Sequence, residues 1–182
     1  MSGILTALGR LDFLEALWLF PLAVVLHEAE EWNLVRWYER NYDDLLPMTN
    51  KSARIVLVLM SSAFLLWSAV AIVTQSPKVA ALILLPAMAI VLQNALQHVY
   101  WLFYFRQYAP GAVTAVLLLL PTVGYLAARA VQQHYAPIWY VVALMVLNIP
   151  GLIQTVQAGN TMTSFFRAVH NVGIAIAQWW LW

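Results

Sequence analysis

The sequence predicts an all-α integral membrane protein built as a helical bundle of five to six transmembrane helices. Of its 182 residues, 63% are hydrophobic and only 9% are charged, and the mean hydropathy is +0.76. A soluble domain is about 45–50% apolar and about a quarter charged, so this chain has too few polar residues to cover a soluble fold. The third observation is a series of long apolar runs, because a membrane-spanning helix needs about 20 mostly apolar residues. Together these features predict one transmembrane domain over residues 1–182.

Six segments of the chain are expected to be helical. The predicted transmembrane spans are residues 11–36, 53–75, 79–105, 112–130 and 137–156. The breaks between them contain proline, glycine or asparagine, which favour turns. The last segment, residues 164–182, is expected to be either a sixth span or an interfacial helix, because its polar residues fall on one helix face and its apolar residues on the other.

The first span ends in an unusually polar stretch, VVLHEAEEWN, residues 24–33. His27, Glu30 and Glu31 stand at positions i, i+3 and i+4 and therefore share one helix face. All eight acidic residues of the chain lie between Asp12 and Asp44. Any carboxylate chemistry must therefore come from this helix or from the loop that follows it.

The third span carries a polar stripe of its own. Asn94, Gln97, His98 and Trp101 follow one another at helical spacing, and we expect them to face the bundle interior because polar groups are costly against lipid. The first and third spans run in the same direction if one span separates them. His27 and His98 each lie about two turns before an arginine near the end of their span, so the two imidazoles are expected at a similar depth.

This layer predicts a site for one divalent metal ion. The expected ligands are His27, Glu31, His98 and His170, since the last segment would bring His170 back to the same depth if it spans. Imidazole and carboxylate ligands suit zinc or iron, and thiolate ligands are excluded because the chain has no cysteine. The H-x-x-E spacing mirrors the E-x-x-H element of four-helix di-iron proteins, but the carboxylates are too few for a two-metal centre.

The expected catalytic residues are Glu30, Glu31 and Asn94. One glutamate would bind the metal and the other would act as a general base, while Asn94 and Asn148 would orient ligands or an oxyanion. A structural alternative remains open, in which the polar residues of the first span cap the helix at the headgroup layer and Glu28 pairs with an arginine. The third-span histidine would then be a buried residue that hydrogen-bonds across the bundle.

The positive charges predict an orientation and a location. Lysine and arginine gather around the loop between the first two spans, which places that loop in the cytoplasm and the N-terminus outside. We expect the protein in a bacterial cytoplasmic membrane, with membrane lipid and a hydrophobic small-molecule substrate as partners. No basic tract points to nucleic acid, and the sequence predicts no oligomeric state.

The motif HEAEE, residues 27–31, resembles the defining motif of the HXXEE family of small multi-pass membrane proteins. Asn94 and His98 match downstream polar positions of that family, and the resemblance covers residues 21–157. The resemblance implies these site residues: His27, Glu30, Glu31, Asn94 and His98. The family has no assigned biochemical role, so the resemblance implies no substrate, and the segment with His170 lies outside it.

Four functions remain open from the sequence. The first is a membrane-embedded, metal-dependent enzyme that acts on a lipid-like or hydrophobic substrate by a hydrolytic or hydroxylating step, in the cytoplasmic half of the bundle. The second is a metal-free isomerase or hydratase that uses the same His and Glu residues as acid and base. The third is a proton-coupled or metal-ion transporter, for which Glu15 would extend a polar path toward the outer side, unless it pairs with Arg129. The fourth is an accessory subunit of a larger complex.

Overall fold

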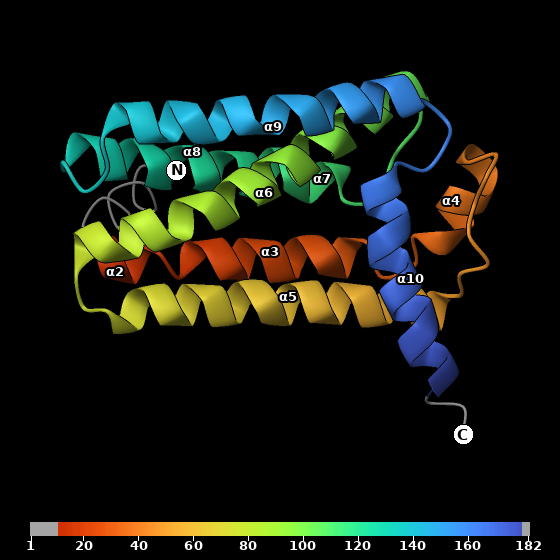
Figure 1. Ribbon diagram of the computed structural model, residues 1–182, viewed down its shortest axis with the longest axis horizontal. Coiled ribbons are helices and arrows are strands. Elements are labelled where there is room, and N and C mark those ends of the chain that lie inside the picture. The colour runs from red at the N-terminus through yellow and green to blue at the C-terminus, as the bar shows by residue number, and fades with distance from the viewer. Residues whose placement is uncertain (1–10, 180–182) are drawn as a thin grey trace.

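The computed structural model describes residues 11–179 of the chain, and every regular element within them is a helix. The long helices lie side by side along one axis (Figure 1). In chain order the helices are α2 (Phe13–Ala16), α3 (Leu19–Glu30), α4 (Val35–Asn41), α5 (Asn50–Val73), α6 (Pro77–Tyr104), α7 (Ala112–Thr114), α8 (Leu120–Gln132), α9 (Ile138–Ala158) and α10 (Ser164–Trp179). A π-helical segment, Ala115–Leu119, joins α7 to α8 without a break.

Within residues 11–179, four helical stretches are long and apolar enough to cross a membrane. They are Asn50–Val73, Pro77–Tyr104, Ala112–Gln132 and Ile138–Ala158. These stretches correspond to the predicted spans 53–75, 79–105, 112–130 and 137–156. The prediction of a helical membrane bundle is therefore confirmed, and its boundaries differ from the observed ones by a few residues.

The first predicted span, residues 11–36, is not one continuous helix. Asp12 and Glu15 form a reciprocal capping box that starts α2 at Phe13, and the helix stops after Ala16. Pro21 explains the break, because proline has no N–H to donate to the carbonyl group four residues earlier. That carbonyl group, of Leu17, instead accepts a hydrogen bond from the Phe20 N–H at 3.2 Å.

The same predicted span also ends earlier than expected. Helix α3 stops at Glu30 rather than at Arg36, and a turn over residues 31–34 leads into α4. The turn is held by short backbone hydrogen bonds, such as that from the Leu34 N–H to the Glu31 carbonyl at 3.0 Å. Helix α3 still runs alongside α5 (Figure 1). The polar motif consequently lies at the end of the bundle where α3 turns into α4.

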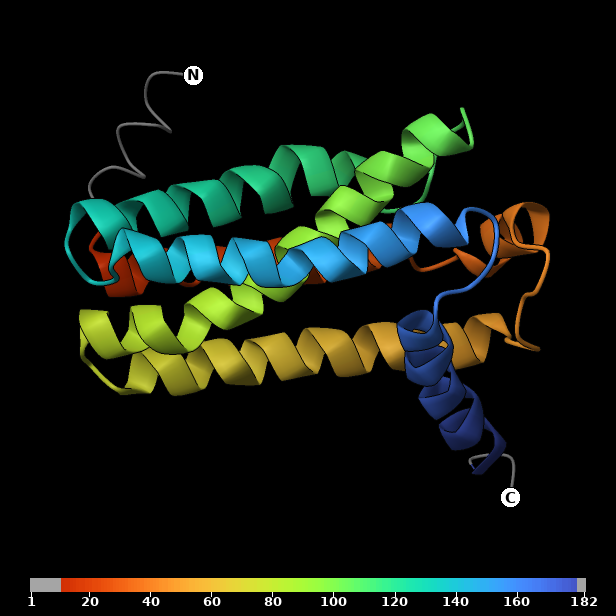
Figure 2. The same cartoon turned by 45° about the horizontal axis from the view of Figure 1, so that its top comes forward.

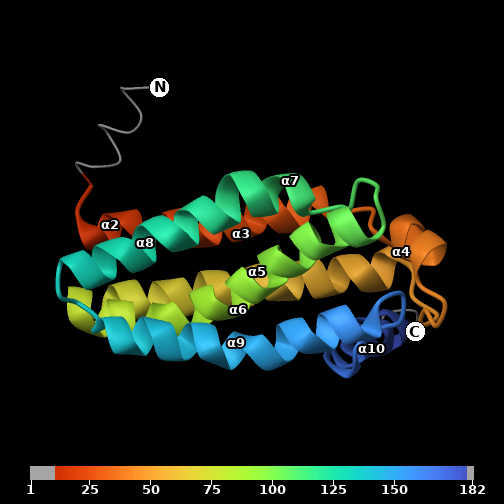
Figure 3. The same cartoon turned by 90° about the horizontal axis from the view of Figure 1, so that it is seen from above.

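Helix α6 lies between the other long helices and carries the third-span polar stripe. It packs against α5, α9, α8 and the π-helical segment, as seen from above in Figure 3. Small residues at its contacts, including Ala80, Ala87 and Ala95, are fully buried and let neighbouring backbones approach closely. This central position buries His98 as well.

Helix α10 crosses the end of the bundle at a steep angle to the other long helices (Figures 1 and 2). Its start is tied to the loop before α5 by an ion pair between Arg167 and Asp44. Gly173 lies against α5, where an added Cβ atom would clash with the Ser52 carbonyl group. This orientation favours the interfacial alternative for the last segment over a sixth span, and residues 180–182 of that segment lie outside the described part.

Candidate functional site

Two residues of the HEAEE motif are buried at the end of α3. His27 is 1% exposed and Glu31 is 6% exposed. They stand one helical turn apart and therefore lie on the same face, which meets side chains of α6 and α7. A histidine and a carboxylate at this level of burial need polar partners, because an unpaired buried charge is very costly.

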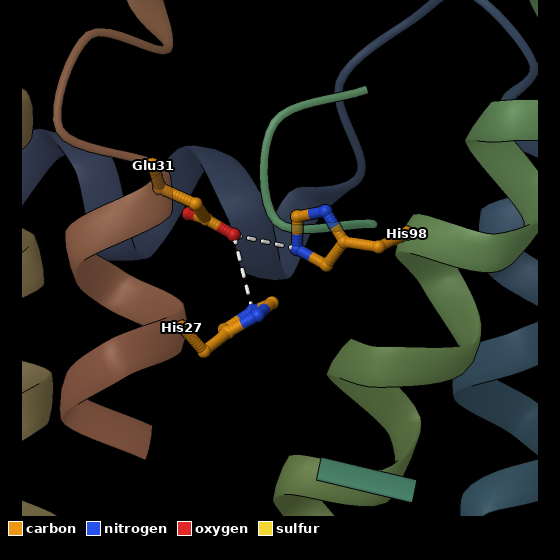
Figure 4. Close-up of side chains that lie close together, drawn as sticks. All are labelled: His27, Glu31 and His98. Carbon is orange, nitrogen blue, oxygen red and sulfur yellow. Dashed lines mark ion pairs between the residues drawn. The ribbon is translucent and has the colours of Figure 1, made fainter. Parts of the chain in front are cut away.

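His98 of α6 meets these two residues. Its Nε2 atom lies 2.7 Å from Glu31 Oε1, and His27 Nε2 lies 3.2 Å from the same oxygen. The two imidazole rings are nearly perpendicular, with centroids 4.8 Å apart. Figure 4 shows both histidines directed at one oxygen of Glu31. The two histidines thus lie at the same depth, as the sequence predicts.

Both contacts have the N···O distances of His–Glu ion pairs. Glu31 Oε1 is buried and makes no hydrogen bond of acceptable geometry, although two imidazole nitrogens lie within 3.2 Å of it. Within residues 11–179, His27, Glu31 and His98 form the single group whose ligand atoms lie close enough to hold a metal ion, all within 4.8 Å of one another. We call these three residues the His-Glu-His cluster.

Thr114 fixes the orientation of His27. The Thr114 hydroxyl lies 2.5 Å from Glu30 Oε2 and 2.9 Å from His27 Nδ1. The hydroxyl has one proton, and it donates this proton in a hydrogen bond to the Glu30 carboxylate, because charge-assisted hydrogen bonds are stronger than neutral ones. Thr114 Oγ1 must then accept from His27 Nδ1–H, so a neutral His27 keeps its lone pair on Nε2, the atom nearest Glu31.

Asn94 contacts the other side of the His27 ring. Its side-chain amide lies one helical turn before His98 on α6, and Asn94 Oδ1 is 2.8 Å from His27 Nε2. The oxygen and nitrogen of an asparagine amide can exchange places in such a network, so Asn94 can serve either protonation state of His27. Asn94 lies beside His27, and its orienting role stays a prediction.

Glu30 lies outside the cluster and binds the backbone instead. Its carboxylate accepts hydrogen bonds from the Val113 and Thr114 N–H groups at 3.2 and 2.8 Å, from the Thr114 hydroxyl and from the Tyr108 hydroxyl at 2.6 Å. Burial and this bond to a carboxylate raise the pKa of Tyr108. Glu30 thus caps the start of α7, a position suited to holding Thr114 in place rather than to moving a proton.

Gly111 covers the cluster from the turn before α7. Its φ angle is +86°, and an added Cβ atom would lie 2.6 Å from Glu31 Oε1 and 2.8 Å from the Cε1 atoms of His27 and His98. Only glycine therefore fits at this position. The sequence marks Gly111 only as a turn residue, and neither it nor Thr114 is among the predicted site residues.

His170 reaches the same end of the bundle but is not part of the cluster. It is 4% exposed, packs on Phe166 with ring centroids 4.3 Å apart, and lines a cavity together with Glu31 and His98. Burial lowers the pKa of His170 to about 4, partly opposed by the negative charge of Glu31. The imidazole is therefore neutral near pH 7, and the structure places it beside the cluster rather than in it.

Two further predicted polar residues serve their own helices. Asn148 donates a hydrogen bond to the Leu144 carbonyl group at 3.1 Å, one turn earlier in α9. Glu15 is engaged in the capping box of α2, and Arg129 bonds to the Leu11 carbonyl group. A transporter would need a polar path toward the outer side. The Glu15 carboxylate is not free to contribute to such a path, because it caps α2.

Comparison with known proteins gives one match. Residues 18–126, more than half of the chain, match the family model described as "Protein of unknown function with HXXEE motif". The matched stretch contains the whole His-Glu-His cluster, together with Asn94, Gly111 and Thr114. Neither the curated proteins nor the solved structures contain a match to the chain.

Proposed function

The chain belongs to the HXXEE family, and from that premise we propose that the His-Glu-His cluster holds one divalent metal ion in a membrane-embedded enzyme. The match to the family model supports the family. The proposal depends on a single observation, the buried Glu31 Oε1 atom that lies within 3.2 Å of two imidazole nitrogens without a hydrogen bond. Three ligand atoms that converge without hydrogen-bonding one another are what a cation would bind.

The ligand set favours zinc or iron. Two imidazole nitrogens and one carboxylate oxygen are typical of catalytic metal sites, which leave a position open for water or substrate. An ion bound here supplies Lewis acidity to a substrate oxygen. The surrounding residues then have supporting roles, because hydrogen bonds to ligand histidines set their tautomer and orientation. Thr114 is placed for that role, because it contacts His27 Nδ1 and not the Nε2 atom that faces Glu31.

The substrate class follows from the location of the site. The cluster lies near the end of helices that are long and apolar enough to span a membrane, and the cavities beside it are bounded by those helices. We propose that the enzyme acts on a lipid-like or hydrophobic substrate by a hydrolytic or hydroxylating step. A metal-free acid–base isomerase or hydratase is the second candidate, and the close pairing of Glu31 with His27 and His98 favours it.

Metal analysis of the detergent-purified protein tests the proposal. Purified without chelators and then supplied with zinc or iron, the native protein is expected to contain about one metal ion per chain by mass spectrometry. His27→Ala and His98→Ala should lose the metal while circular dichroism shows the helices intact. His134→Asn is the matched control, because His134 lies in the turn after α8 with a positive φ angle that asparagine tolerates.

Each outcome separates the candidates. Metal retained by the native protein and by His134→Asn, and lost from both cluster variants, supports the metalloenzyme. A native protein that takes up no metal under these conditions contradicts it and leaves the acid–base candidate.

A further inference from the structure

Glu28 is a carboxylate that none of the interactions described so far uses. It follows His27 on α3 but lies on another face of the helix, and it borders both cavities beside the cluster. The sequence-based alternative pairs Glu28 with an arginine. Within residues 11–179, no hydrogen bond or ion pair engages its side chain. Glu28 is therefore free to bind a ligand in these cavities.

The two cavities adjoin each other and differ in character. The larger, of about 260 Å³, is bordered mainly by apolar side chains. These are Val24, Met60, Phe64, Ile90, Val91, Leu119 and Phe165. The smaller, of about 100 Å³, borders Glu31, His98 and His170. Glu28, Gln93 and Gln97 line both cavities. One ligand could therefore occupy both, with its apolar part in the larger cavity and its polar end in the smaller one.

The cavities lie in a wedge between two helices. Figures 1 and 2 show that α5 and α6 are adjacent at one end and diverge toward the end where α10 crosses. Phe165 of α10 borders both cavities there. Ile90 lines the apolar cavity and is 43% exposed, so this cavity lies close to the outer surface of the bundle. We expect an apolar chain to enter there from the bilayer.

The charges of the lining residues indicate the kind of polar head. Glu28 and Glu31 are the acidic residues that border the cavities, and no lysine or arginine is among the lining residues in the described part of the chain. A phosphate or carboxylate head would therefore meet carboxylates without a cationic side chain to bind it. A divalent ion on the cluster would balance the two carboxylates, which favours an uncharged head.

Two unused nitrogen atoms indicate that this head forms hydrogen bonds. The Nδ1 atoms of His98 and His170 are buried and have no hydrogen-bond partner in the described structure, and both rings line the polar cavity. Their residues are only 2% and 4% exposed. Buried polar atoms are rarely left unpaired, so a ligand that both donates and accepts hydrogen bonds would satisfy them together with Glu28.

We propose that these cavities bind a single-chain amphiphile with an uncharged hydroxyl or amide head, with its chain in the apolar cavity and its head bonded to Glu28. The combined space is near the lower end of the roughly 300–1,000 Å³ typical of small-molecule sites. This inference deepens the proposed function, because it names the substrate class for that site. Glu28, rather than Glu30, is then the carboxylate that touches the substrate.

Photolabelling in lipid nanodiscs tests the binding. The probe is a long-chain fatty alcohol that carries a photoreactive diazirine and an alkyne, with the matching fatty acid as the charged counterpart. The alcohol is expected to label peptides of α3, α5 and α6, and excess monoacylglycerol should compete. Met60 borders both cavities, so Met60→Trp narrows them and should lower labelling at least about fivefold. Leu66→Trp is the matched control, because Leu66 lies on α5 and is 66% exposed.

Glu28→Gln tests the polar end without changing the side chain's size. Loss of one hydrogen bond from the carboxyl group should weaken alcohol binding about two- to tenfold, and the preference for alcohol over acid should disappear. Equal labelling of the native protein and Met60→Trp would overturn the proposal, as would a fatty acid that competes as well as the alcohol.

Metal content measured on the same samples separates this proposal from the proposed function. Met60→Trp should keep its metal while it loses labelling. A native protein without metal that still shows the labelling pattern would overturn the metalloenzyme and leave the amphiphile site standing.

Discussion

The backbone of Gly111 lies directly against the carboxylate of Glu31. A Cβ atom at residue 111 would come within 2.6 Å of Glu31 Oε1 and within 2.8 Å of carbon atoms in both cluster histidines. The turn after α6 thus closes over the His-Glu-His cluster at a distance that permits no side chain.

Replacing Gly111 by alanine should damage both stability and metal binding. The positive φ angle alone costs an L-residue about 1–2 kcal/mol, and the clash displaces the turn or the ligands. We expect a lower melting temperature and a loss of bound metal. Gly124→Ala is the matched control, because an added Cβ there meets nothing within 4 Å and alanine is favoured inside a helix by about 0.5–1 kcal/mol. A Gly111→Ala variant that melts and binds metal like the native protein would contradict this account.

Replacing Thr114 by valine should weaken metal binding. Valine keeps the shape of threonine but removes the hydroxyl that joins Glu30 to His27. Loss of such a partner to a metal-binding histidine typically costs about 10–100-fold in affinity. Competition against a chromophoric zinc chelator measures the change. Thr114→Ser should recover most of the affinity, since it restores the hydroxyl, and equal affinities for the valine variant and the native protein would exclude the proposed role.

The adjacent residues Glu30 and Glu31 should respond differently to the same substitution. Glu31→Gln removes a proposed ligand and should abolish metal binding. Glu30→Gln should instead destabilise the turn before α7 by about 1.5–3 kcal/mol, because two N–H groups and two hydroxyls donate to its carboxylate. Metal content and thermal unfolding, measured on both variants, give the comparison. A Glu30→Gln variant that loses all metal at full thermal stability would make Glu30 a ligand, contrary to the structure.

Much of the fold follows from the sequence, because an apolar run of about 20 residues specifies a spanning helix almost regardless of its neighbours. The cluster follows in part, since helical spacing puts His27 and Glu31 on one face and the direction of the spans brings His98 to their depth. Hydropathy does not predict the break at Leu17, because a capping box and a proline interrupt the helix inside an apolar run.

The remaining site residues depend on tertiary packing. Gly111 and Thr114 reach the cluster only because the turn before α7 folds back over it. No spacing in the sequence therefore marks them as site residues. The roles of Glu28 and Glu30 depend on which helix faces α3 on each side. Helical spacing gives their relative direction, about 100° per residue, but it cannot say which direction meets a cavity and which meets the turn before α7.

The crossing of α10 over α5 depends on one small residue. Gly173 is buried, and an added Cβ atom would clash with the Ser52 carbonyl group and the Val56 side chain of α5. Helices approach this closely only where a small residue removes the side chain between them. The same helix carries His170 to the polar cavity one turn earlier, so the contact at Gly173 also sets the depth of His170.

Gly173→Ala should therefore push α10 away from α5 and draw His170 out of the polar cavity. The backbone oxygen of Ser52 cannot move aside as a flexible side chain would, so the helix must shift. Because the chain has no cysteine, spin labels on introduced cysteines report the distance cleanly. Val172 and Leu66, 52% and 66% exposed, are suitable labelling positions on α10 and α5. Double electron–electron resonance should show a longer and broader distance distribution in Gly173→Ala, with Gly124→Ala unchanged. An unaltered distribution would mean that α10 is held by the Arg167–Asp44 pair rather than by its contact with α5.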